Sequence, residues 1–362
     1  MFYIEEISIE KAKDLLNCCG LSVPAGVDYT AGVYDDGTGT LVATGSLNGD
    51  MIQGMAVDPM RQGEDLMGKL LTHLIEEAHR KGRTDLYLFT KPEKAVQFQG
   101  LGFKLVASAR PYAALLEWGK EGIQEYKNKL DTVRTEAESK LCQGKQSQEI
   151  GTIVMNCNPF TAGHRYLVET AASQVEILYV IVVEEDKSLF SYEDRFNMAK
   201  LAVEDLKNVV VLGGDRYAVS SLTFPSYFTG EEKVASAHTA VDAEIFARHI
   251  GPSLGTTIRF VGTEPLSPVT AIYNEALEAR LPRAGIQVQV VERKCSMDGV
   301  VSASRVRALL LELYEKDALN LEDYYGPSGE GLKELLPVTS YTYIGTEDVL
   351  KKLAMQFEEG KR

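Results

Sequence analysis

The amino-acid sequence predicts an α/β protein with an N-terminal α+β domain and a second domain built on a parallel sheet. At 362 residues the chain is long enough for about two domains. A charged and then polar segment at residues 119–149 separates two stretches with different patterns. Beyond residue 150, Ile- and Val-rich strands alternate with amphipathic helices, which is typical of a parallel sheet buried on both faces.

In the N-terminal domain, residues 1–118, predicted strands alternate with helices. Strands are expected at residues 2–7, 29–34, 40–46, 51–57 and 86–90, and helices at 9–18 and 66–78. Asp35–Gly39 carries the residues of a hairpin turn between the second and third strands. His79–Gly82 ends the second helix with cations and a glycine, as helix C-termini favour.

A helical linker at 119–149 leads into the second domain, residues 150–315, and a helical extension at 316–362 follows. The expected strands of the second domain are 150–155, 177–183, 209–212, 257–261 and 286–291, and its helices are 164–173, 192–206, 242–250, 268–279 and 302–311. Ligands of such sheets bind beyond the carboxyl ends of the strands. Ligand-binding residues are therefore expected in the segments that follow strands.

Composition narrows the class of partner. A net charge of −14 argues against nucleic acid or an anionic membrane as the main partner. Any phosphate site must then be a local basic pocket. The five cysteines show no C-x-x-C spacing, and no apolar run approaches the roughly 20 residues of a membrane span. With no signal-peptide pattern at the N-terminus, we expect a cytoplasmic protein with reduced thiols, no nucleic-acid partner and no membrane partner.

The most informative segment joins the strand at 150–155 to a helix through the polar turn Asn156–Gly163. A strand-turn-helix joint directs unpaired backbone N–H groups at one spot, which suits a phosphate. Gly163 lets the backbone approach, and Thr161 and His164 can donate to phosphate oxygens. The turn residues included in this predicted nucleotide site are Asn156, Asn158, Pro159 and Phe160. The alternative is an ordinary core histidine.

A second anion site is predicted at Val301–Arg307. Ser302 is a natural N-cap, and Ser304 and Arg305 fall in the first helical turn. Hydroxyl groups, a guanidinium and the helix dipole together can hold an anion. The sequence leaves open whether Arg305 or Arg307 faces the phosphates, and an ordinary helix cap is the alternative.

Two further segments follow strands. Lys187, after the second strand of this domain, would neutralise phosphate or orient an acyl acceptor, and a solvated loop lysine is an equal alternative. At another strand end, Gly262, Glu264 and Thr270 could contact the nucleotide, although helix entry alone would also explain this segment.

Residues 1–118 resemble the GNAT N-acetyltransferase fold. The matching residues are Val57-Asp58-Pro59, Gln62-Gly63 and Phe98–Phe103. In that family, a glycine-rich turn before the long helix holds the pyrophosphate of acetyl-CoA. Here Asp65 and Met67 stand at the later glycine positions, which favours a retained fold that docks a partner or weakly binds a CoA-like arm.

The segment Thr161-x-Gly163-His164 resembles the signature of the nucleotidyltransferases, whose domain is Rossmann-like. A GNAT-like half fused to such a half, with Leu336–Ile344 in the tail, resembles the citrate lyase ligase family over nearly the whole chain. The resemblance implies that ATP and acetate, with Mg²⁺ (Mg2+), give acetyl-AMP and pyrophosphate. The acetyl group would then pass to the thiol of the phosphoribosyl-dephospho-CoA arm on the citrate lyase acyl-carrier subunit.

The expected roles follow from this chemistry. Acetate is already a nucleophile, so the barrier comes from the negative charge on the α-phosphate and on the departing pyrophosphate. His164 and Thr161 would stabilise phosphate, and Lys187 would serve the second substrate. Ser302, Ser304 and Arg305 would hold the pyrophosphate. The alternatives are an adenylyltransferase of the phosphopantetheine adenylyltransferase type and a nucleotide-binding adaptor without turnover.

Overall fold

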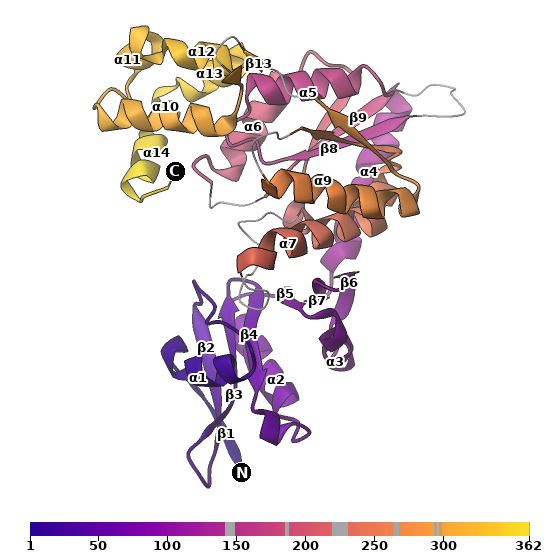
Figure 1. Cartoon of the computed structure of the whole chain (residues 1–362), viewed down its shortest axis with the longest axis vertical. Coiled ribbons are helices and arrows are strands. Elements are labelled where there is room, and N and C mark those ends of the chain that lie inside the picture. Colours follow the sequence, from indigo (N-terminus) through magenta and orange to yellow (C-terminus); the bar gives the residue numbers. More distant parts are fainter. Residues whose placement is uncertain are drawn as a thin grey trace. The chain divides into compact units, whose positions relative to one another are not determined.

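The computed structural model describes residues 1–141, 149–184, 188–218, 231–263, 268–292, 295–296 and 299–361. The chain forms two compact units (Figure 1). Unit 1 contains Met1–Tyr126 and Phe224–Ile245, and unit 2 contains Lys127–Thr223 and Phe246–Arg362. The helix α4 (Gly122–Leu141) runs across the boundary, where the sequence predicts a helical linker. The return of residues 231–245 to unit 1 has no counterpart among the sequence predictions.

Unit 1 is an α+β unit on a sheet of seven described strands in the order β1-β2-β3-β4-β5-β7-β6. The strands are β1 (Phe2–Glu6), β2 (Tyr29–Asp35), β3 (Leu41–Asn48), β4 (Met51–Val57), β5 (Leu86–Thr90), β6 (Lys104–Ala109) and β7 (Ala113–Trp118). The helices are α1 (Lys13–Cys18), α2 (Leu66–Arg80), α3 (Ala95–Gly100) and α7 (Glu231–Ile245), with short 3-10 turns η1 (Ile9–Ala12), η2 (Pro59–Arg61) and η3 (Pro92–Lys94).

The core of unit 1 forms where α2 packs against β2, β3 and β4. Its apolar positions Leu66, Leu70 and Leu74 recur at helical spacing and are buried. The strands β4 and β5 pair in parallel, with Met51 opposite Tyr87 and Ile52 opposite Leu88, whereas the other pairs in this sheet are antiparallel. The helix α7 contacts β6 and β7.

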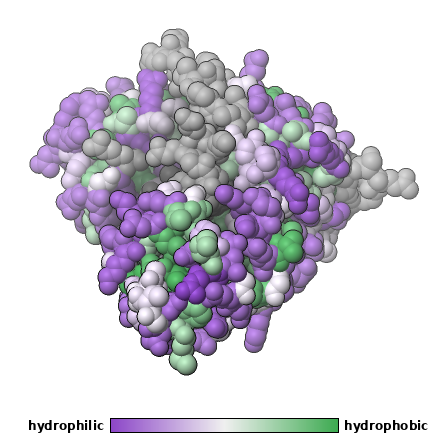
Figure 2. Space-filling view, turned by 60° about the horizontal axis from the view of Figure 1, so that its bottom comes forward, coloured by the Kyte–Doolittle hydropathy of each residue, from purple (hydrophilic) through white to green (hydrophobic). Residues whose placement is uncertain are grey.

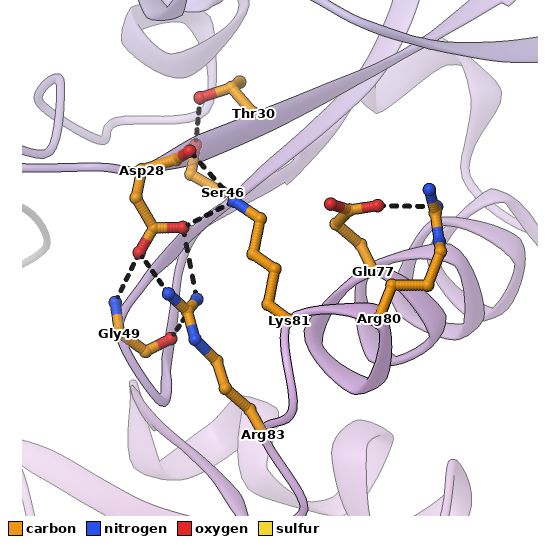
Figure 3. A network of polar contacts seen from close by, with 8 residues as sticks. All are labelled: Asp28, Thr30, Ser46, Gly49, Glu77, Arg80, Lys81 and Arg83. Carbon is orange, nitrogen blue, oxygen red and sulfur yellow. Dashed lines mark hydrogen bonds and ion pairs between the residues drawn. The ribbon is translucent and has the colours of Figure 1, made fainter.

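Asp28 joins three segments of unit 1 (Figure 3). Arg83 donates to both carboxylate oxygens, at 3.1 and 2.9 Å, and Lys81 donates at 3.0 Å. The Gly49 N–H donates at 2.8 Å, and Arg83 also reaches the Gly49 carbonyl at 2.7 Å. Burial alone would raise the pKa of Asp28, but the hydrogen bonds from Arg83, Gly49 and Lys81 outweigh it and lower this pKa. The network therefore ties the start of β2 to the β3–β4 turn and to the end of α2.

Asp28→Asn should lower the free energy of unfolding at pH 7 by on the order of 1 kcal/mol, because a neutral amide attracts the two cations far less. The folded pKa lies below the unfolded value of about 3.9. The stabilisation is thus present above that value and is lost as pH falls through the folded pKa. Urea unfolding, monitored by the fluorescence of Trp118, the single tryptophan, gives the free energy of unfolding at pH 7 and at pH about 3. The exposed Asp36→Asn is the control, and an equal loss for Asp28→Asn at both pH values would contradict the assignment.

Unit 2 is built on a sheet whose five described strands are all parallel, in the order β10-β9-β8-β11-β12. The strands are β8 (Ile150–Met155), β9 (Ile177–Val182), β10 (Val209–Gly213), β11 (Ile258–Gly262) and β12 (Gln287–Val291). Each starts and ends within a residue or so of its predicted range. Every residue of β9 is buried, as expected for a strand covered on both faces.

The helices of unit 2 follow the predicted order. They are α5 (Ala162–Ala172), α6 (Tyr192–Ala202), α8 (Gly251–Leu254), α9 (Pro268–Arg280) and α10 (Ala303–Glu315), with the short turns η4 (Asp215–Tyr217) and η6 (Leu281–Ala284) and the strand pair β13 (Cys295–Ser296) and β14 (Gly299–Val300). Two predictions are wrong in detail. The helix predicted at 242–250 is the end of α7 followed by the π-helix η5 (Phe246–Ile250), and the helix predicted at 192–206 ends at Ala202.

The tail is helical, as predicted. It contains α11 (Leu321–Tyr325), the turn η7 (Pro327–Gly329), α12 (Glu330–Leu335), α13 (Val338–Ile344) and α14 (Glu347–Glu358). The rings of Tyr324 and Tyr341 stack with 4.9 Å between their centroids, and each hydroxyl donates to the other residue's backbone carbonyl at 2.9 Å. In Figure 1, α12 and α13 lie beside α5 and α6, and α13 contacts α6 while α12 contacts α5. We call residues 316–361 the C-terminal extension.

The face drawn in Figure 2 is mostly hydrophilic, with small apolar patches between charged and polar residues. Across the described ranges, we find no helix with both the length and the apolar character needed to cross a bilayer.

Candidate functional site

The candidate site lies where the strand order of unit 2 reverses. From the central strand β8, the chain proceeds to β9 and β10 on one side, and β11 and β12 lie on the other. In sheets of this kind, ligands bind in the crevice outside the carboxyl ends of the strands at this switch point. The segment Asn156–Thr161, which we call the switch-point turn, leaves β8 here, and Gly262 ends the neighbouring β11.

Thr161 and His164 form a reciprocal cap at the start of α5. The Thr161 N–H donates to His164 Nδ1 at 3.0 Å, and the His164 N–H donates to Thr161 Oγ1 at 3.4 Å. Because Nδ1 accepts this bond, the hydrogen-bond pattern assigns the proton of the neutral ring to Nε2. The buried Phe160 lies beside the ring, with 5.5 Å between ring centroids. The predicted histidine is thus oriented as a hydrogen-bond donor through Nε2.

The structure brings the two predicted anion-binding segments together. A Cβ atom on Gly163 would lie 3.1 Å from the Val301 carbonyl oxygen, so the start of α5 touches the residue before Ser302. Arg307 Nη1 donates to the Asn158 carbonyl at 2.7 Å. The segments are about 140 residues apart in the sequence, and these contacts place both at the same edge of the sheet.

The two arginines of the second segment differ in their contacts. Ser302 caps α10 by accepting the Arg305 N–H at 3.2 Å. Arg307 is occupied by protein groups, because it bonds Asn158 and also donates to Ser304 Oγ at 3.2 Å. Burial lowers the pKa of Arg307. Arg307 therefore holds the switch-point turn, and phosphate contact by Arg305 stays a prediction.

Arg195 is a residue of the site region that sequence reasoning missed. Its side chain is fully buried, and Nη1 donates to the Asn156 carbonyl at 2.8 Å and to Asn156 Oδ1 at 2.7 Å. Asn158 Oδ1 in turn accepts the Phe190 N–H at 3.1 Å. A signal was present, because Arg195 falls on the same helical face as the buried Met198 and Ala202.

Cys157 lies within the turn but has no nucleophilic environment. It is buried and adopts a left-handed backbone conformation with φ of 54°. Burial raises the pKa of its thiol, and only the thiolate is a good nucleophile. A covalent role for this cysteine is therefore disfavoured.

The structure describes only some of the remaining predicted site residues. Lys187 and Glu264 lie outside the described residues, and the side chain of Thr270, in the first turn of α9, is also not described. The Asn158–Pro159 peptide is cis, and Pro159 is buried. Within the described ranges, no group of three or more His, Cys, Asp or Glu side chains could hold a metal ion.

A separate cavity of about 830 Å³ lies within unit 1. Gln62, Gly63, Asp65 and Met67 line it, in the turn that resembles the acetyl-CoA turn of GNAT proteins. Gly63 and Asp65 have positive φ values of 96° and 56°, a conformation that suits glycine better than aspartate. Asp65 therefore lines this cavity at a position where its backbone conformation favours glycine.

Unit 2 combines a parallel sheet with the switch-point turn, its histidine cap and the adjoining Ser-x-Ser-Arg helix, which is the arrangement that the resemblance to nucleotidyltransferases predicts. Unit 1 has an α+β fold on a mixed sheet. Residues 150–344 match the family model described as the citrate lyase ligase C-terminal domain. The chain belongs to the citrate lyase ligase family.

Two citrate lyase ligases agree with this assignment. The chain is 42% identical over 274 residues to the citrate (pro-3S)-lyase ligase of Klebsiella pneumoniae, covering 74% of this chain and 77% of that protein. It is 33% identical over 351 residues to the corresponding protein of Haemophilus influenzae, covering 94% and 97%. Glucosamine-6-phosphate N-acetyltransferase from Arabidopsis thaliana, a solved structure, aligns with 29% of this chain and 92% of its own, at 18% identity and a TM-score of 0.25.

Proposed function

We propose that this protein is an ATP-dependent ligase that activates citrate lyase. Acetate and ATP would give acetyl-AMP and pyrophosphate. The acetyl group would then pass to the thiol of the phosphoribosyl-dephospho-CoA arm on the citrate lyase acyl-carrier subunit. The contact between the two predicted anion-binding segments at the switch point carries this proposal. Membership of the citrate lyase ligase family supports it.

Neither step requires a nucleophile from the enzyme. An acetate oxygen attacks the α-phosphorus of ATP, the bond to the bridging oxygen breaks, and its electron pair leaves with pyrophosphate. The thiolate of the arm then attacks the acetyl carbon, the bond to the AMP oxygen breaks, and AMP leaves with the electron pair. The thiol proton passes to solvent. Because acetate is already ionised, catalysis consists of positioning and charge stabilisation.

The chain's own residues supply these two functions. The Nε2–H of His164 and the hydroxyl of Thr161 would donate to phosphate oxygens, and Gly163 allows the close approach. Ser302, Ser304 and Arg305, at the start of α10, would hold the departing pyrophosphate. Lys187 is kept as the proposed contact for the second substrate. Mg²⁺ would neutralise phosphate charge while held mainly by the phosphates and water, since it seldom needs an all-protein cage.

An exchange assay tests the proposal. The protein is incubated with ATP and labelled pyrophosphate, with or without acetate and other small carboxylates, and label in ATP is counted. We expect exchange that requires acetate, and pyrophosphate release that rises further with deacetylated citrate lyase. Exchange that requires phosphopantetheine instead would indicate an adenylyltransferase, and ATP binding without any turnover would indicate an adaptor.

Gly163→Ala should lower the exchange rate by about tenfold, because misplacement of reacting groups by a fraction of an ångström is costly. The new methyl group would press on the Val301 carbonyl at 3.1 Å and push the two segments apart. Gly331→Ala is the matched control in unit 2, since its Cβ meets only the Leu309 side chain at 3.5 Å. Equal exchange rates for both variants would contradict the close approach at Gly163.

A further inference from the structure

The first turn of α6 connects two parts of unit 2 that are far apart in the sequence. Its adjacent residues Asp194 and Arg195 are both buried. Asp194 bonds to the C-terminal extension, and Arg195 bonds to the switch-point turn. One helical turn thus contacts both segments.

Asp194 is surrounded by donors. Tyr343, on α13, donates its hydroxyl to Oδ1 at 2.9 Å, and the ammonium of Lys352, on α14, lies 3.6 Å from the same oxygen. The Ser191 hydroxyl donates to Oδ2 at 2.6 Å and caps the helix by accepting the Asp194 N–H at 3.2 Å. A buried carboxylate with these partners fixes the start of α6 against the extension, because leaving it without them would be costly.

Arg195 reaches in the other direction. Its Nη1 lies within 2.8 Å of three acceptors, namely the Asn156 carbonyl, Asn156 Oδ1 and the Val183 carbonyl. Its Nε donates to the Phe190 carbonyl at 3.2 Å. These acceptors lie at the carboxyl ends of β8 and β9 and in the loop before α6. The rigid, planar guanidinium therefore sets the spacing between the switch-point turn and its neighbours.

We propose that Arg195 is a positioning residue for the nucleotide site and that the C-terminal extension holds it in place through Asp194. Arg195 bonds Asn156, the first residue of the switch-point turn. It acts on ATP through the switch-point turn, which starts at Asn156 and ends at the Thr161–His164 cap. The extension, which follows α10 in the sequence, thereby helps to shape the site through Tyr343. This inference rests on the proposed function for its activity measurement.

Two variants test it. Arg195→Lys keeps a buried cation but cannot span the same acceptors, and Tyr343→Phe removes the hydroxyl that donates to Asp194 and that also bonds Asn197 on the same helix α6. Tyr341→Phe is the matched control, because it removes a hydrogen bond of the same length from the same helix, donated to Tyr324 inside the extension. For each variant we would measure the thermal midpoint, the ATP dissociation constant by calorimetry, and KM and kcat in the acetate-dependent exchange.

We expect the ATP dissociation constant and KM to rise by about threefold for Tyr343→Phe and by about tenfold for Arg195→Lys, the range that one or two hydrogen bonds supply. Tyr341→Phe should lower the thermal midpoint without changing either constant. Wild-type ATP constants in folded Arg195→Lys and Tyr343→Phe, or an equal change in Tyr341→Phe, would overturn the proposal. If the wild type shows no acetate-dependent exchange, the proposed ligase reaction fails, and the calorimetric comparison still decides the positioning role.

Discussion

His164→Ala should lower kcat in the acetate-dependent exchange by about 10²-fold or more, because it removes a preorganised donor at the point where phosphate charge develops. The cap with Thr161 fixes the ring so that Nε2 carries the proton, and alanine has no group that replaces it. Steady-state exchange kinetics at saturating ATP measure the effect.

The same substitution also removes half of the helix cap, so a control must separate the two consequences. His164→Gln supplies that control, since glutamine at this position can accept the Thr161 N–H as in a capping box. We expect His164→Gln to recover thermal stability relative to His164→Ala while kcat stays low. Wild-type turnover in a folded His164→Ala protein would remove this histidine from the mechanism.

Arg305→Ala should lower kcat/KM for ATP by about 10- to 100-fold with little change in the thermal midpoint, because a charge-assisted contact to pyrophosphate is lost. Arg307→Ala should behave differently. It leaves the carbonyl of the buried Asn158 without this donor, which costs about 1–3 kcal/mol, whereas the exposed Ser304 hydroxyl can bond water instead. Both the stability and the ATP affinity of Arg307→Ala should therefore fall.

Thermal melts and exchange kinetics on the two variants decide between these roles. Arg307→Lys extends the comparison, since lysine keeps the charge but cannot donate to Asn158 and Ser304 in the same planar geometry. If Arg305→Ala matches the wild type while Arg307→Ala loses activity without losing stability, the roles assigned to the two arginines are reversed.

Local patterns predicted most of the fold. Strands β8 to β12 lie close to their expected ranges because apolar runs and turn residues are properties of neighbouring positions. The path of α7 was missed for the opposite reason. Its return to β6 and β7 depends on contacts more than 100 residues away, and nothing in residues 231–245 specifies their partner.

The site shows the same division. The Ser302 cap was predicted, since capping residues act over three or four positions. Thr161 and His164 were predicted only as phosphate donors, and their reciprocal cap was not foreseen. The contact of Arg307 with the switch-point turn could not be predicted, because it depends on where the Asn158 carbonyl lies after the sheet has assembled. Arg195 was missed because a charged side chain in a loop-and-helix segment is usually solvated, and only packing of the whole unit buries it.

We propose that one ATP molecule is held between the switch-point turn and the start of α10. A crystal structure with a non-hydrolysable ATP analogue and Mg²⁺ tests it most directly. We predict phosphate oxygens within about 3.5 Å of both His164 Nε2 and at least one donor among Ser302, Ser304 and Arg305. An analogue that contacts only one of these two segments, or that binds elsewhere in the chain, would contradict the account.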